Sequence, residues 1–295
     1  MAAVAPLALK YGLPEGRDEF VSAPLADHPF DTATHIERNG DRLRGTTSDA
    51  YWAFIGPFGG ITTATLLRAA FEHKDRLGDP LAITVNFCAP VARGAFDIDL
   101  TLARANRSTQ HWSMVLAQEE TGVAATATAI FAARRPGFAH QPAEPPIATA
   151  YEELVALDTR KYASWVQRYE FRFAEGAPIY SRTPLPEPAS AMSKFWLRDE
   201  PARPIDFLSL AAMSDAFFAR IFHVRGAIVP FGTVSLTTYF HVDGADLARL
   251  GSGPILALAD ASVFNKSFGD QKGELWSRDG QLLATCHQIA YFRDP

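Results

Sequence analysis

The chain has 295 residues, of which 47% are hydrophobic and 21% charged, as expected for a globular protein with one large domain or two. Its net charge is −5 and no block of basic residues occurs, so nucleic acid is not an expected partner. The two cysteines, Cys88 and Cys286, exclude a disulfide framework and favour a reducing compartment. The first residues lack a basic start followed by a long apolar core. We therefore expect no signal peptide, no membrane span and a cytoplasmic location.

The first half of the chain predicts a hairpin, one core helix and four strands. Asn39-Gly40 is a favourable hairpin dipeptide between two short strands over 34–48. Gly59-Gly60 opens an apolar run that predicts a core helix up to Phe71. The four strands are expected over 83–90, 96–104, 111–118 and 123–134.

A proline-rich stretch, residues 136–148, separates this half from a second half that repeats its order of elements. A second core helix is expected over 207–222. Strands are expected over 168–173, 193–198, 233–242, 254–264, 272–278 and 281–293. One apolar helix for each antiparallel sheet is an α+β design, and two such units in tandem resemble a double hotdog. We expect an N-terminal hotdog over 1–135, a linker over 136–164 and a C-terminal hotdog over 165–295.

The helix expected over 207–222 carries one carboxylate among apolar residues. It is apolar nearly all the way round, which predicts a core helix, and Asp215 lies in the middle of its apolar stripe. Burial of an unpaired carboxylate costs several kcal/mol or raises its pKa. Asp215 is therefore expected to serve either a hydrogen-bonded structural network or a reaction.

Two strands of the second half carry further polar residues. Thr233, Ser235 and Thr237 alternate along one strand, so we expect them on the same face of it. Because threonine is a good strand residue, such a row is by default structural. Gln288 lies between apolar residues on the last strand, where a buried amide must find hydrogen-bond partners.

Motifs of several other enzyme classes are absent from the sequence. Neither His-Glu-x-x-His nor Cys-x-x-Cys occurs, so no metal site is expected. Without Gly-x-Ser-x-Gly a serine hydrolase is disfavoured. The glycine-rich phosphate-binding motifs are also missing, and we expect no cofactor.

Several short motifs resemble the TesB-type acyl-CoA thioesterases. In the second half, Met213-Ser214-Asp215 resembles the family's Ser-Asp, and Tyr239-Phe240-His241 resembles its Trp-Phe-His. Residues 279–293 look like the family's C-terminal strand with its catalytic Gln. In the first half, Phe58-Gly59-Gly60 resembles the family's helix-opening glycines, and Arg107-Ser108 with Gln118 resembles the strand segment that follows. The resemblance spans most of the chain but leaves the linker unmatched.

The resemblance implies a double hotdog in which an Asp, a hydroxyl residue and a Gln position a hydrolytic water. Carried over, these residues are Asp215, Thr233 and Gln288. The Asp-His that follows the family's hydroxyl is Ser235-Leu236 here, so Ser235 or Thr237 could take the place of Thr233. This departure also suggests a different acyl preference.

Elementary chemistry agrees with these roles. A partly buried carboxylate with a raised pKa can take a proton from water, while a hydroxyl and an amide hold that water in line. We expect the backbone N–H groups of Gly59 and Gly60, at the start of a helix, to stabilise an oxyanion. Direct attack by Asp215 on the thioester stays open.

The leading hypothesis is an acyl-CoA thioesterase that hydrolyses acyl-CoA to a free acid and CoA. A hotdog enoyl-CoA hydratase is a second hypothesis, although Asp215 and His223 are not spaced as its Asp and His would be. A non-catalytic double hotdog that binds an acyl group or a partner protein is a third. The acyl chain length and the choice between CoA and acyl carrier protein stay open. Pairing of chains into a homo-oligomer is suggested only by the resemblance.

Overall fold

The computed structural model describes residues 28–39, 42–181, 185 and 189–293. In the first half, one long helix precedes four long strands. The elements are α1 Pro29–Ala33, β1 Ile36–Asn39, β2 Arg42–Thr46, the 3-10 helix η1 Asp49–Tyr51, α2 Gly59–Phe71, β3 Asp79–Phe87, β4 Ala95–Ala105, β5 Thr109–Gln118 and β6 Gly122–Ala132. The predicted core helix and four strands are confirmed, with ends shifted by a few residues. The predicted hairpin is the antiparallel pair β1–β2, although Gly40 of its turn lies outside the described residues.

The second half has a similar order of elements, with its core helix broken in two. The elements are the 3-10 helices η2 Tyr151–Glu153, η3 Thr159–Lys161 and η4 Ser164–Arg168, then β7 Tyr169–Glu175, β8 Ser193–Asp199, α3 Phe207–Met213, α4 Arg220–Arg225, β9 Phe231–Phe240, α5 Gly244–Leu250, β10 Ile255–Asp260, β11 Phe264–Asn265, β12 Phe268–Trp276 and β13 Leu282–Phe292. The sequence pattern misses α5, although Asp243 and Asp246 form a capping box at its start. The strand expected over 254–264 is wrong beyond Asp260. There the carboxylates of Asp260 and Asp270 accept the next backbone N–H groups and turn the chain.

The single helix expected over 207–222 is also wrong. The chain leaves the helical conformation after α3 and re-enters it only at Arg220. The backbone N–H of Arg220 donates to Gln271 Oε1 at 2.6 Å, and its guanidinium Nε donates to the carbonyl oxygen of Phe218 at 2.8 Å. These hydrogen bonds hold the intervening segment out of the helix. Asp215 therefore follows a helix instead of standing in the middle of one.

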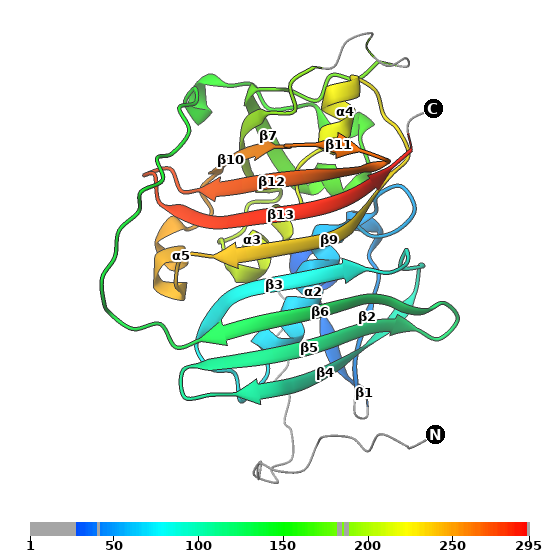
Figure 1. Cartoon of the computed structure of the whole chain (residues 1–295), viewed down its shortest axis with the longest axis vertical. Coiled ribbons are helices and arrows are strands. Elements are labelled where there is room, and N and C mark those ends of the chain that lie inside the picture. Colours follow the sequence, from blue (N-terminus) through cyan, green and yellow to red (C-terminus); the bar gives the residue numbers. More distant parts are fainter. Residues whose placement is uncertain (1–27, 40–41, 182–184, 186–188, 294–295) are drawn as a thin grey trace.

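The strands of the described residues join one antiparallel sheet (Figure 1). Its order is β1-β2-β4-β5-β6-β3-β9-β13-β12-β10-β8-β7, with β11 paired to β12. β3 and β9 lie side by side at the centre, so the two halves of the chain share one continuous sheet. The domain boundaries expected at 135/136 and 164/165 stay a prediction, and the part of the first domain before residue 28 lies outside the described residues. Within the described ranges, no helix is long and apolar enough to cross a membrane.

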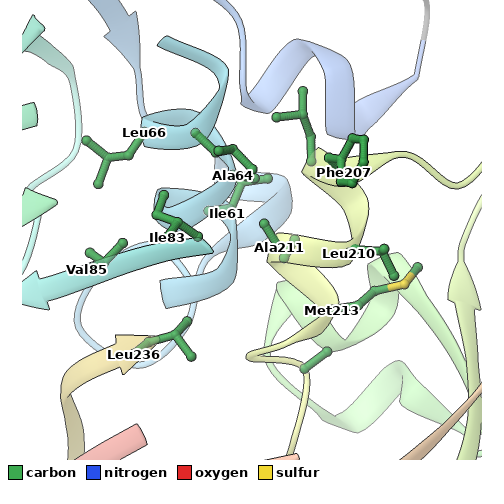
Figure 2. Packing of buried hydrophobic residues seen from close by; sticks show 14 of the residues in the cluster. Ile61, Ala64, Leu66, Ile83, Val85, Phe207, Leu210, Ala211, Met213 and Leu236 are labelled. Carbon is green, nitrogen blue, oxygen red and sulfur yellow. The ribbon is translucent and has the colours of Figure 1, made fainter. Parts of the chain in front are cut away.

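The two core helices pack against each other and against the central strands (Figure 2). The buried side chains between them are Ile61, Ala64 and Leu66 of α2, Ile83 and Val85 of β3, Phe207, Leu210, Ala211 and Met213 of α3, and Leu236 of β9. Removal of this apolar surface from water is the main term that stabilises the fold. Gly60 permits the close approach of α2 and α3, because a Cβ there would lie 2.4 Å from the carbonyl oxygen of Ala212.

This contact makes Gly60→Ala a direct test of the helix packing. The added methyl group must displace the backbone of α3, so we expect a loss of about 1–3 kcal/mol in the free energy of unfolding. The control is Gly137→Ala, since a Cβ at Gly137 meets nothing within 4 Å, and its effect should stay within about 0.5 kcal/mol. Chemical denaturation measures both variants. Equal stability of the two variants would contradict the packing described here.

Candidate active site

Asp215 lies in the turn after α3, at the wall of a cavity of about 330 Å³. Only 8% of the residue surface is exposed. The turn is held by Ser214, whose hydroxyl lies 2.7 Å from Thr238 Oγ1 on β9. Sequence reasoning did not single out Thr238, which is fully buried. The cavity opens to solvent beside the exposed side chains of Phe54 and Ile55.

The Asp215 carboxylate lies against the first turn of α2. Its Oδ1 accepts a hydrogen bond from Gln288 Nε2 at 2.8 Å, and the backbone N–H of Gly60 also donates to the carboxylate. A Cβ at Gly59 would lie 2.6 Å from Asp215 Oδ2, so only glycine allows this approach. The partial positive charge at the start of a helix favours a negative group in this position.

A chain of two amides runs from α4 to this carboxylate. The backbone N–H of Arg220 donates to Gln271 Oε1 at 2.6 Å, and Gln271 Nε2 donates to Gln288 Oε1 at 2.9 Å. A backbone N–H can only donate, so it sets the orientation of the first amide, and the first amide sets the second. Gln288 must therefore present its NH₂ group to Asp215.

Gln271 is a site residue that sequence reasoning missed. It lines the cavity, whereas Gln288 is not among the described residues that do so. Only 3% of Gln271 is exposed. The signal for it is the strand register, which sets Gln271 on β12 opposite Gln288 on β13. That register cannot be read from local sequence.

Burial raises the pKa of Asp215 to about 7, although the hydrogen bonds from Gln288 and Gly60 act to lower it. Burial also raises the pKa values of the neighbouring Tyr169 hydroxyl and Cys286 thiol, so these groups stay neutral while Asp215 titrates. Asp215 therefore exchanges a proton near neutral pH, as a general base must.

A second carboxylate, Asp199 on β8, is also buried. Burial raises its pKa to about 8, but it does not line the cavity. Its two oxygen atoms have no hydrogen-bond partner among the described residues. Asp199 will therefore contribute to the pH dependence of stability without facing the same space as Asp215.

The expectation that Thr233, Ser235 and Thr237 share one face of their strand is wrong. β9 is irregular where it pairs with β13, since Ile289 pairs with Ser235 and Ala290 pairs with Thr233. This bulge turns Thr233 to the inner face, where it lines the cavity with Asp215.

Ser235 and Thr237 lie on the outer face of the sheet. Thr237 Oγ1 lies 3.0 Å from the hydroxyl of Thr84 on β3, across the junction of the two halves. Ser235 pairs with the exposed Ile289. Neither of the two lines the cavity, so of these three hydroxyl residues only Thr233 shares it with Asp215.

The two glycines at the start of α2 differ in the use of their N–H groups. The N–H of Gly60 is taken by Asp215. Gly59 lines the cavity, and in the described part of the chain its N–H makes no hydrogen bond. The Gly59 N–H at a helix N-terminus can therefore receive a developing negative charge inside the cavity.

The remaining wall of the cavity is largely apolar. It is rich in aromatic side chains, namely Phe58, Phe87, Trp165, Phe217, Phe218 and Phe231. No histidine is among the described residues that line it. His223 instead lies on α4, with Nδ1 3.2 Å from Tyr180 Oη and Nε2 3.1 Å from the carbonyl oxygen of Gly176. Across the described ranges, no three or more His, Cys, Asp or Glu side chains form a metal-binding group.

Two protein-family models match the chain. Residues 48–132 match the acyl-CoA thioesterase N-terminal domain, and residues 138–292 match the acyl-CoA thioesterase C-terminal domain. No curated protein sequence matches the chain.

Solved structures with the same fold include a hot dog fold protein of unknown function from Alicyclobacillus acidocaldarius. It is 38% identical, with a TM-score of 0.86, and the match covers 92% of this chain and 100% of that one. A tesB protein of Mycobacterium avium subs paratuberculosis is 19% identical, with a TM-score of 0.73 and coverage of 90% and 98%. Acyl-CoA thioesterase II TesB2 of Mycobacterium marinum is 17% identical, with a TM-score of 0.71 and the same coverage. These likenesses confirm the predicted α+β double hotdog.

The raised pKa of Asp215 predicts that its charge costs stability. Between the ordinary value of 3.8 and the folded value of about 7, the folded state binds a proton that the unfolded state has lost. Stability from this group is therefore present below pH 4 and is lost as the pH rises through 7. Asp215→Asn should match the wild type near pH 4 and be more stable above pH 7, by up to a few kcal/mol.

Thermal unfolding of the two proteins from pH 4 to pH 9 measures this difference. The control is Glu144→Gln, which removes an exposed carboxylate outside the cavity and should show the same difference from the wild type at every pH. A constant offset between Asp215→Asn and wild type across the range would show that Asp215 is not a perturbed acid.

Proposed function

The chain belongs to the acyl-CoA thioesterase family, and on this premise we propose that it hydrolyses acyl-CoA with Asp215 as the general base. The family makes it a thioester hydrolase. The observation that carries the proposed mechanism is the Asp215 carboxylate itself. It is buried at the wall of an apolar cavity, and its pKa is raised to about 7.

In the proposed first step, Asp215 removes a proton from a water molecule. A carboxylate with an ordinary pKa would be a weak base, whereas one with a pKa near 7 is matched to the task at neutral pH. Thr233 lines the same cavity, and its hydroxyl is proposed to hold the water for in-line attack.

The amides act mainly on Asp215 in this proposal. Gln288 uses its Oε1 on Gln271 and an N–H on Asp215, so it fixes the carboxylate and is a positioning residue. Gln271 faces the cavity and is proposed to offer its remaining amide hydrogen to the water. This assignment differs from the sequence-based expectation, in which Gln288 itself holds the water.

The oxyanion is proposed to form beside the start of α2. Attack of hydroxide on the thioester carbon moves an electron pair onto the carbonyl oxygen. The unbonded N–H of Gly59, supported by the helix dipole, would stabilise this charge. When the intermediate collapses, the C–S bond breaks and the CoA thiolate leaves with the electron pair. The proton held by Asp215 returns to that thiolate.

The alternatives have less support. An enoyl-CoA hydratase would need a histidine beside the acid, and none is among the described residues that line the cavity. A binding module without activity does not explain why a carboxylate is buried there at a cost in stability.

We also propose a reducing compartment such as the cytoplasm, because both cysteines are free thiols, one exposed and one buried. The residues assigned to the reaction all come from one chain, so a single copy carries a complete site. Association into a homo-oligomer stays a prediction.

Release of free thiol from acyl-CoA substrates tests the proposed function. The wild type should hydrolyse acyl-CoA. In Asp215→Asn, kcat should fall by about a hundredfold or more, which is the scale of general-base catalysis. The control is Asp158→Asn. Asp158 forms an ion pair with Arg160 at 2.7 Å outside the cavity, so this variant should keep the wild-type rate. Unchanged turnover in Asp215→Asn would exclude Asp215 as the base while leaving the thioesterase activity.

A further inference from the structure

The cavity beside Asp215 is small for a fatty acyl chain. Its volume of about 330 Å³ holds roughly eleven non-hydrogen atoms, if each takes the ~30 Å³ of a water molecule in the liquid. Ligand cavities usually measure roughly 300–1,000 Å³, so this one lies at the lower limit. Three of these eleven or so atoms are the carbon, oxygen and sulfur of the thioester group. The cavity therefore encloses roughly eight atoms of the acyl group beyond the carbonyl carbon.

Packed aromatic rings form a buried part of the wall of this cavity. Trp165 stacks on Phe58 with ring centroids 4.3 Å apart and planes at 6°. Phe218 packs against Trp165 at 5.9 Å and against Phe171 of β7 at 5.5 Å. Phe58 and Phe218 are only 4% and 6% exposed. Since the rings packed against them belong to the hydrophobic core, the cavity cannot extend on this side without unpacking that core.

The composition of the wall distinguishes between acyl groups of equal size. Ring–ring contacts in edge-to-face or offset geometry add to the free energy of simple burial, by about two- to tenfold in affinity for each pair. Aromatic rings make up much of the wall, and Phe87 and Phe231 belong to the same wall as Thr233. A flexible alkyl chain gains burial alone and loses rotational freedom when it binds.

We propose that the preferred acyl group is a short one that ends in an aromatic ring, of about the size of phenylacetyl. This inference rests on the proposed function and names the substrate class of the same cavity. Phenylacetyl and octanoyl thioesters have the same number of carbon atoms, so their comparison isolates the ring. Beyond its carbonyl carbon, a palmitoyl chain exceeds the roughly eight atoms that the cavity encloses by about seven.

Binding is measured first, apart from turnover. Isothermal titration calorimetry on Asp215→Asn compares phenylacetyl-CoA, octanoyl-CoA and palmitoyl-CoA without hydrolysis. We expect phenylacetyl-CoA to bind at least about fivefold more tightly than octanoyl-CoA, and palmitoyl-CoA to bind most weakly. Tighter binding of either alkyl substrate would overturn the inference, whatever the protein does in catalysis.

Turnover by wild type then separates the two proposals. The ratio of kcat/KM for phenylacetyl-CoA to that for octanoyl-CoA should follow the binding preference. A high rate with octanoyl-CoA or palmitoyl-CoA as the better substrate would reject the aromatic class and keep the thioesterase. Absence of thiol release from every substrate would reject the proposed function, while the binding order still decides the inference.

Phe218→Leu removes one ring of this buried part of the wall and should lower that kcat/KM ratio at least threefold, with a gain for substrates longer than octanoyl-CoA. The matched control is Phe131→Leu, which removes a fully buried ring on β6 that is not among the described residues lining the cavity. It should leave the ratio unchanged. If Phe218→Leu fails to fold, Phe87→Leu at the same wall provides the test. An unchanged ratio in the folded wall variant would contradict the role of these rings.

Discussion

A carboxylate buried at the start of a helix is the interaction on which the candidate site depends. Asp215 is 8% exposed and keeps its charge near neutral pH only with donors close by. Those donors are the backbone N–H of Gly60 and the amide of Gln288. The approach requires glycine at position 59, where a Cβ would lie 2.6 Å from Oδ2. The stability lost through burial and the reactivity gained from a raised pKa have the same physical origin.

The candidate site takes residues from both halves of the chain, which one continuous sheet holds together. α2, from the first half, provides the glycines. The turn after α3 provides the acid, and β12 and β13 provide the amides, all from the second half. The pairing of β3 with β9 keeps the two halves in register. The break between α3 and α4 is part of the same arrangement, because Arg220, which ends it, orients Gln271 and through it Gln288. A continuous helix over 207–222 would remove the N–H that sets this orientation.

The local sequence pattern predicts α2 and most of the strands, because alternation and glycine or proline punctuation are local properties. The repeated order of these elements predicts the double hotdog. The local pattern also selects Asp215 as an anomaly among apolar residues. Local pattern fails where contacts between residues far apart in the sequence determine the structure. The hydrogen bond that ends the helix break joins Arg220 to Gln271, 51 residues further along the chain. The bulge that turns Thr233 inward depends on the pairing of β9 with β13. Strict alternation therefore wrongly predicts Ser235 and Thr237 on the same face of the strand as Thr233. Gln271 is missed because only strand register sets it beside Gln288.

The most direct test of the account is the pH dependence of kcat/KM for the wild type. Asp215 must be ionised to accept a proton, and burial raises its pKa to about 7. The account therefore predicts that log kcat/KM rises with a slope of one below about pH 7 and reaches a plateau above it. A rate that is constant from pH 5 to pH 9, or that changes only near pH 4 as for an ordinary aspartate, would contradict it.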